Sequence, residues 1–202
     1  MFIQSGGTNT GTGLRVGNQG GSSGTYNLSN GLFRATYEYV GQSGTGVVNQ
    51  TGGNNTVTDT PGHGSLVLGG FPGSSGTYNL SNGLLSVDES IVGNYGAGVM
   101  NQWGGTNKVT YDLHLGDLTG GSGTYNLSNG LLSANNTYVG YSGTGVVNQA
   151  GGNHTVTNIL WLGHQSGSSG IYNLSNGVLS AANTFVGGAG TGVVNQVGGS
   201  LQ

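Results

Sequence analysis

Cysteine is absent from this 202-residue chain, proline occurs only twice and charge is scarce. Without cysteine the chain has no disulfide framework and no thiolate metal site. Charged residues make up 4% of the sequence, the net charge is −3, and Arg15, Arg34 and Lys108 are the only basic side chains. Nucleic acids and anionic membrane surfaces are bound by clustered Lys and Arg, so we expect neither partner. No apolar run approaches the ~18 residues of a membrane span, and we expect no membrane insertion.

Glycine is abundant instead, with 46 residues. Such a content is typical of low-complexity or disordered chains, but disorder usually accompanies high net charge and few aromatic or β-branched residues. This chain has almost no charge, 10 Tyr and many Val and Thr. It also lacks the Gly-x-y period of collagen. The composition therefore favours a folded, glycine-rich architecture.

The motif GTYNLSNG begins at Gly24 and returns at Gly76, Gly123 and, as GIYNLSNG, at Gly170, at intervals of 52, 47 and 47 residues. Each long repeat divides into two related segments, an A segment that begins with this motif and a B segment that begins with GTGVVNQ or a variant of it. The segments are 20 to 27 residues long, which is close to one turn of a parallel β-helix. We place their starts near residues 2, 24, 44, 76, 96, 123, 143, 170 and 190, in a single repeat domain. The 52-residue interval indicates an insertion loop near 59–63 in the second B segment.

Apolar residues alternate with polar ones, as in Leu66/Leu68, Leu113/Leu115 and Leu160/Leu162. This period of two is typical of strands with one buried face, and frequent glycine disfavours helix. Asn-Gly pairs at 30–31, 82–83, 129–130 and 176–177 supply the positive φ of tight corners. We therefore predict an all-β fold without helix. It is a parallel β-solenoid of about eight to nine coils with three short strands per coil.

Stacked coils place equivalent residues on top of one another at the strand spacing of ~4.8 Å. One asparagine recurs in every complete segment and a following glutamine recurs in B segments. Their amides are expected to form a structural ladder along the axis. A ligand-binding polar array is the alternative interpretation. The predicted ladder consists of Asn27, Asn49, Asn79, Asn101, Asn126, Asn148, Asn173, Asn195, Gln50, Gln102, Gln149 and Gln196.

The consensus GTYNLSNGxL...YVGxSGTGVVNQxGGxxTV...LxLG resembles the Gly- and Asn-rich β-strand repeats of bacterial surface proteins, the autotransporter-type passengers and PEP-CTERM-type exported proteins. The resemblance covers essentially the whole chain. It implies a right-handed parallel β-solenoid at or outside the cell surface with a structural or adhesive role. Because the repeat pattern already includes Phe2, we expect no signal peptide before it, and an extracellular location is implied by the resemblance alone.

Parallel β-helices also host polysaccharide-degrading enzymes, which need clustered carboxylates. The six acidic residues do not align into a column, and the four histidines are expected to be scattered over the surface. We therefore predict neither an enzyme nor a metal or cofactor site. The acids are Glu38, Asp59, Asp88, Glu89, Asp112 and Asp117, and the histidines are His63, His114, His154 and His164.

Two columns suggest alternative functions. An outward stripe would bind carbohydrate or pack against a neighbouring solenoid, unless the A-segment members point inward. Its residues are Arg15, Tyr39, Val67, Ile91, His114, Tyr138, Trp161 and Phe185. A threonine column would order water on an ice-binding face. Its residues are Thr25, Thr45, Thr77, Thr124, Thr144 and Thr191, with Ala97 and Ile171 interrupting it.

Both ends of the chain, FIQSGG and VNQVGGSLQ, lie at the same phase of a B segment and carry no polar capping repeat. An uncapped coil presents unpaired backbone groups, so we expect end-to-end stacking of copies, or continuation of a longer array. The sequence thus predicts a non-enzymatic structural or adhesive element of a bacterial extracellular fibre or surface protein. Its partners are expected to be further copies of itself and, on the alternative interpretation, glycans.

Overall fold

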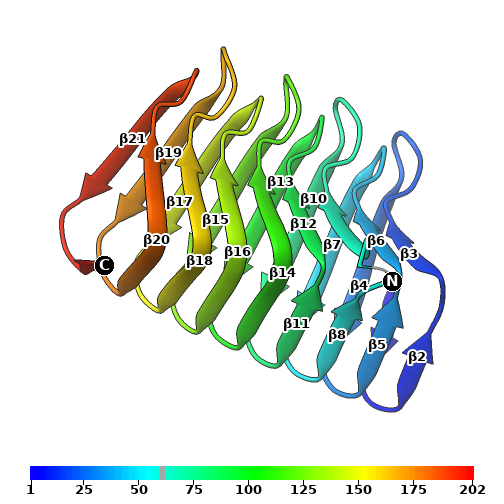
Figure 1. Ribbon diagram of the computed structural model, residues 1–202. Coiled ribbons are helices and arrows are strands. Elements are labelled where there is room, and N and C mark those ends of the chain that lie inside the picture. The colour runs from blue at the N-terminus through cyan, green and yellow to red at the C-terminus, as the bar shows by residue number, and fades with distance from the viewer. Residues whose placement is uncertain (60–61) are drawn as a thin grey trace.

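The computed structural model describes residues 1–59 and 62–202 and shows a parallel β-solenoid of about eight turns, with no helix in this part of the chain. The coils stack along one axis, and the two termini lie at opposite ends (Figure 1). Each coil adds a strand to one face, turns at glycine, and adds the next to the opposite face. The expected fold class is therefore confirmed.

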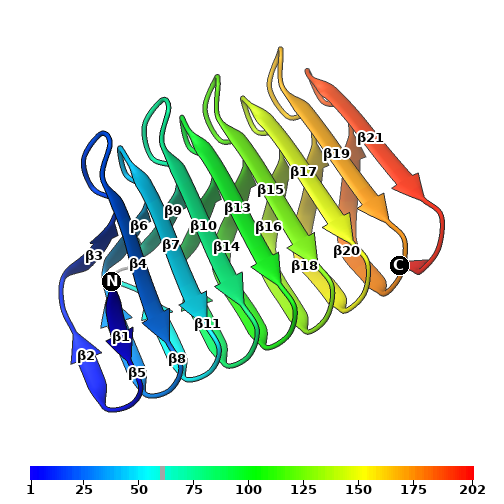
Figure 2. The same ribbon diagram turned by 180° about the vertical axis from the view of Figure 1, so that it is seen from behind.

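One face of the solenoid is a nine-stranded parallel sheet, seen in front in Figure 2. Its strands in spatial order are β1 (Phe2–Gln4), β4 (Ser23–Leu28), β7 (Thr45–Gln50), β10 (Ser75–Leu80), β13 (Ala97–Gln102), β15 (Ser122–Leu127), β17 (Thr144–Gln149), β19 (Ser169–Leu174) and β21 (Thr191–Gln196).

The opposite face is a thirteen-stranded sheet. Its strands in chain order are β2 (Thr8–Thr10), β3 (Gly13–Val16), β5 (Leu32–Ala35), β6 (Tyr37–Val40), β8 (Asn54–Val57), β9 (Ser65–Leu68), β11 (Leu84–Val87), β12 (Glu89–Val92), β14 (Thr106–Leu115), β16 (Leu131–Val139), β18 (Asn153–Leu162), β20 (Val178–Val186) and β22 (Ser200–Leu201).

Three strands per coil, as expected, occur only in the first half of the solenoid. From β14 onward the second and third strands merge into one strand that shifts register at a bulge, for instance between Val109 and Asp112. A bulge bends a strand without ending it, so the merged strands keep the bend that separates the shorter strands of the earlier coils.

Coil length is periodic. Equivalent asparagines in successive coils are 22, 30, 22, 25, 22, 25 and 22 residues apart. A coils therefore take 22 residues and B coils take 25, while the 30-residue coil carries the expected five-residue insertion. Of the insertion at 59–63, Thr60 and Pro61 lie outside the described residues.

The core fills the space between the two sheets. Alternate residues point inward as the period of two predicts, and Leu66, Leu68, Leu113, Leu115 and Leu160 are all fully buried. At the corners the predicted Asn-Gly pairs adopt the required turn, with φ of 88 to 90° at Gly31, Gly83, Gly130 and Gly177. In the first of these turns the Asn30 Oδ1 atom accepts a hydrogen bond of 2.8 Å from the Gly31 amide.

The predicted threonine column is wrong. Thr25 pairs with Val47 and Thr45 pairs with Ser23, because the A and B strands are offset by two residues from the alignment at Gly-Thr. Thr77 likewise lies between Val47 and Val99. In one column on the outer face of the nine-stranded sheet, Thr therefore alternates with Val. In another column, most of the B-segment threonines lie beside serines. Among the described residues, the predicted threonines therefore do not form one continuous column.

Candidate functional site

The eight predicted asparagines lie directly above one another on the outer side of the nine-stranded sheet. After Asn27, each side-chain amide nitrogen donates to the Oδ1 atom of the preceding asparagine, for example from Asn126 to Asn101, and the seven bonds measure 2.7 to 2.9 Å. Each interior amide thus donates once and accepts once within the ladder. The arrangement links every coil from β4 to β21.

The glutamines do not form a ladder with one another, in contrast to the prediction. Each is separated from the next by a leucine of the intervening A coil, as Gln50 pairs with Leu28 and Leu80. The Gln50 amide nitrogen instead donates to the carbonyl of Leu84, and its Oε1 atom accepts from the Tyr78 hydroxyl at 2.6 Å. Gln102 and Gln149 make the same contacts, and so does Gln4, which the sequence analysis did not include.

These buried tyrosines have a second partner in the B coil that precedes them. Asn55 donates to the Tyr78 hydroxyl and Asn107 to the Tyr125 hydroxyl, at 2.8 and 2.9 Å. His154 occupies the same position in the third repeat, with its Nδ1 atom 2.9 Å from the Tyr172 hydroxyl and its Nε2 atom 3.3 Å from Thr137 Oγ1. A buried Tyr–Gln–Asn (or His) network therefore recurs once per long repeat.

One acidic and one histidine side chain are fully buried, and the histidine, His154, was expected on the surface. His154 is fully buried, which lowers its pKa to about 3. Glu38 is also fully buried in the core, where its Oε2 atom accepts from Asn55 at 2.8 Å. Burial raises the pKa of Glu38 to about 7, against a smaller lowering effect of that hydrogen bond. The Glu38 Oε1 atom has no hydrogen-bond partner among the described residues.

The predicted outward stripe exists as a continuous column on the thirteen-stranded sheet. Its eight residues are paired in register from Arg15 through to Phe185, and the A-segment members do not point inward. It is less exposed than expected, because Val67 and His114 are buried and Trp161 is half-buried. The guanidinium of Arg15 lies over the Tyr37 ring at one end, and Trp161 stacks on Phe185 at the other.

In the middle of the stripe the aromatic rings form a continuous cluster. His114 stacks on Tyr138 with ring centroids 4.9 Å apart, and His164 stacks on Tyr141 at 4.8 Å. Tyr141 lies in a turn outside the strand register, so the column alignment could not identify it. These ring contacts shield the centre of the stripe and leave Phe185 as its exposed aromatic end.

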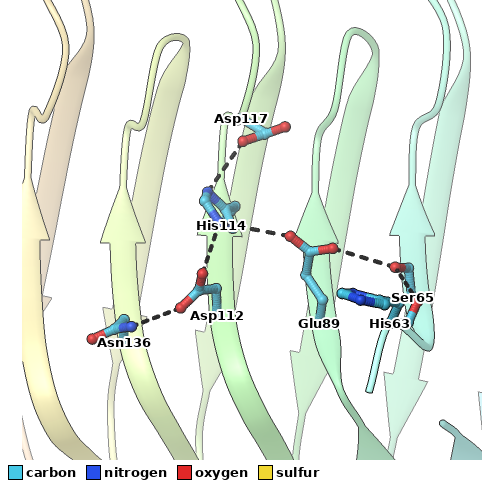
Figure 3. Close-up of polar contacts among 7 residues, drawn as sticks. All are labelled: His63, Ser65, Glu89, Asp112, His114, Asp117 and Asn136. Carbon is cyan, nitrogen blue, oxygen red and sulfur yellow. Dashed lines mark hydrogen bonds and ion pairs between the residues drawn. The ribbon is translucent and has the colours of Figure 1, made fainter. Parts of the chain in front are cut away.

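Three carboxylates converge on His114, contrary to the expectation that the acidic residues remain apart (Figure 3). Asp117 Oδ1 lies 3.1 Å from His114 Nδ1. Glu89 Oε1, from the neighbouring β12, and Asp112 Oδ2 each lie 3.9 Å from His114 Nε2. Glu89 also accepts from Ser65 at 3.3 Å. Ile91 and His114 are paired in the sheet, and Glu89 and Asp112 precede them by two residues each. Both carboxylates therefore lie on the same outer face of the sheet as His114.

The carboxylates determine the charge of His114. Burial alone would lower its pKa, but the neighbouring Asp112 and Asp117 outweigh burial and raise the pKa to about 9. The His114 interaction and the amide of Asn136 lower the pKa of Asp112 in spite of its burial. His114 is therefore a buried imidazolium ion at neutral pH, paired with carboxylates that are partly open to solvent.

Asp112 also begins a second, shorter amide ladder at the bulge. Its Oδ1 atom accepts from Asn136 at 2.7 Å, and Asn136 Oδ1 accepts from Asn158 at 2.8 Å. Asn183 continues the series by donating to the Asn158 carbonyl. These asparagines occur only in the later coils, and this second ladder was not predicted from the sequence.

No group of three or more His, Asp or Glu side chains in residues 1–59 and 62–202 is placed to hold a metal ion. The same residues contain no helix of the length and apolarity needed to cross a membrane. Comparisons with protein-family models, curated proteins and solved structures found no match.

Proposed function

We propose that this chain is a non-enzymatic structural or adhesive element of a bacterial extracellular fibre or surface protein, and that further coils stack on its ends. Rigidity is supported by two continuous parallel sheets and by the asparagine ladder. Solenoids of this kind are stabilised by repeat–repeat interfaces, so each added coil strengthens the rod along its axis.

The observation that carries the stacking proposal is the exposure of core positions in the last coil. Val186 is 50% exposed, whereas Val139, in the same core column two coils earlier, is fully buried. At the other end Phe2 is 54% exposed although it belongs to the column of the buried Tyr26. Each end therefore presents a cross-section of the core that another coil would cover.

The C-terminal face favours an A coil. In the interior, each B-coil glutamine accepts from the tyrosine of the following A coil, as Gln149 does from Tyr172. Within residues 1–59 and 62–202, the side chain of Gln196 bonds only to the Gly199 carbonyl. An identical copy would offer the B-type residue Phe2, which has no hydroxyl group, whereas a copy that began with β4 would offer Tyr26.

Electron microscopy of the purified chain over a concentration series tests this proposal. We compare the full chain with a truncated variant that lacks residues 1–22 and therefore begins with an A coil. We expect short rods for the full chain and longer, unbranched filaments for the truncated variant, because only its joint reproduces the interior B-to-A contact. The matched control is the truncated variant with Tyr26→Phe, which removes the hydroxyl group and should shorten the filaments. If all three chains remain single rods at the highest concentration, end-to-end stacking is wrong.

A further inference from the structure

A cavity of about 430 Å³ opens on the outer side of the thirteen-stranded sheet, beside the bulge of β14. The bulge places Tyr111 and Asp112 next to each other, and β12 and β16 contribute the remaining walls. The side chains that line it are His63, Glu89, Tyr111, Asp112, Asn135 and Asn136. A volume of this size is at the small end of the range for small-molecule sites.

Two of the lining residues, Glu89 and Asp112, flank an incompletely satisfied donor. His114 is nine-tenths buried, and its Nε2 atom points between Glu89 and Asp112 at 3.9 Å from each (Figure 3). These separations exceed hydrogen-bond distance, and a gap of this kind between polar groups is usually bridged by a third polar group. A hydroxyl group satisfies both sides, because its oxygen accepts from the imidazolium N–H and its hydrogen is donated to a carboxylate.

The other lining residues suit a compact ligand with several hydroxyl groups. Tyr111 is 45% exposed, and its ring can pack against the C–H face of a sugar. The Asn135 Oδ1 atom accepts from Thr157, which orients the amide so that its nitrogen is the group left for a ligand. Asn136 is fixed between Asp112 and Asn158.

The hydrogen-bonding groups on both sides of the gap suit a neutral hydroxyl group. An anion in the gap would be repelled by Glu89 and Asp112. An ammonium group has no acceptor, so it could not accept from the His114 N–H. We propose that this cavity binds a neutral sugar residue, with one hydroxyl group between His114 and the two carboxylates and the ring against Tyr111. This site shares His114 with the stripe, but its other residues lie outside the stripe, and it does not depend on the stacking of coils.

The test is saturation-transfer NMR on the full chain with the methyl β-glycosides of glucose, galactose and mannose, followed by titration of the sugar that binds. We expect millimolar binding and a shift of the His114 ring signals on saturation. Tyr111→Ala and Glu89→Gln should each weaken binding about tenfold, the loss of one good contact. Tyr95→Ala is the matched control, because Tyr95 is exposed to a similar extent but lies outside the cavity.

Circular dichroism identifies any variant that has failed to fold, and Glu89→Gln keeps the shape of the side chain. The proposal is overturned if none of the three sugars receives saturation from the protein. It is equally overturned if Tyr95→Ala weakens binding as much as Tyr111→Ala, or if both cavity variants bind like the parent chain. Filament formation is a separate measurement, so failure here leaves the stacking proposal unaffected.

Discussion

His154 replaces Asn107 in the core. Asn107 donates to the Tyr125 hydroxyl at 2.9 Å, and one long repeat later His154 Nδ1 lies 2.9 Å from the Tyr172 hydroxyl. Both side chains are fully buried. The repeat therefore requires a polar group that reaches the tyrosine at this position, and an amide or an imidazole meets the requirement. The two groups differ in that only imidazole titrates near neutral pH.

We predict that His154 makes the fold sensitive to acid. Burial lowers its pKa in the folded chain to about 3, below the ordinary value of 6.5. Between these two pKa values His154 is protonated in the unfolded chain but neutral in the folded chain. The free energy of unfolding is therefore highest above pH 6.5 and decreases as the pH falls towards 3. At pH 4 the loss is roughly 3 kcal/mol. His154→Asn, which copies Asn107, should remove this loss; equal acid sensitivity of both chains in urea titrations would contradict the prediction.

Glu38 should make the fold less stable at high pH, whereas His154 makes it less stable at low pH. Its pKa is about 7 in the fold against an ordinary value of 4.5, so the folded chain binds the proton more tightly than the unfolded chain. Stability that is complete below pH 4.5 is lost as the pH rises through 7, and the loss then levels off at roughly 3 kcal/mol. We expect Glu38→Gln to be more stable than the parent chain at pH 8 and to lose that advantage at pH 4.5. Thermal denaturation at the two pH values measures the difference.

The asparagine ladder should contribute measurably to stability. Asn126→Ala removes two of its hydrogen bonds and leaves Asn101 and Asn148 each without one partner. The expected cost is about 2 kcal/mol, or a fall in Tm of roughly 4–8 °C for a chain of this size. Thr124→Ala, on the same outer face of β15, is the control. Equal midpoints for the two variants would show that the ladder is a consequence of stacking rather than a source of stability.

Glycine is required where a sheet strand passes close to a neighbouring corner. A Cβ atom added at Gly98 would overlap the backbone nitrogen of Gly93 and the carbonyl carbon of Val92. Backbone atoms cannot move aside cheaply in a stacked coil, so Gly98→Ala should cost more than about 3 kcal/mol. Gly20 has open space around its Cβ position, and Gly20→Ala should change stability by less than about 0.5 kcal/mol. Chemical denaturation of the two variants compares them directly.

The fold could be predicted from sequence because its determinants are local and repeated. Leu66 and Leu68 point inward and Val67 outward because side chains alternate along a strand, and repetition places the same pattern in every coil. The register between A and B coils was harder to predict from the sequence. Alignment at Gly-Thr put Thr25 over Thr45, whereas alignment of Asn27 with Asn49 gives the observed pairing of Thr25 with Val47. The hydrogen-bonded asparagine was the better guide, since its partner must lie directly above it.

The candidate site was harder to predict for a different reason. It depends on departures from the earlier coils, namely the insertion beside His63 and the bulge at Tyr111. The alignment of Ile91 with His114 did imply that Glu89 lies beside Asp112. Their joint contact with His114, however, depends on side-chain direction. The turn after β14 recurs in other coils, but the repeat pattern does not show that Asp117 in this turn reaches the same ring.

The alternation of Gln and Leu in one core column restricts how such an array can grow. Gln102 needs Tyr125 in the coil after it, and Leu131 supplies the carbonyl that accepts from its amide. Insertion of a single coil by gene duplication would bring two glutamines or two tyrosines together and leave buried polar groups unsatisfied. Duplication of an A–B pair preserves every contact. The solenoid is built from single coils, but an array of this kind can therefore lengthen by duplication only in pairs of coils.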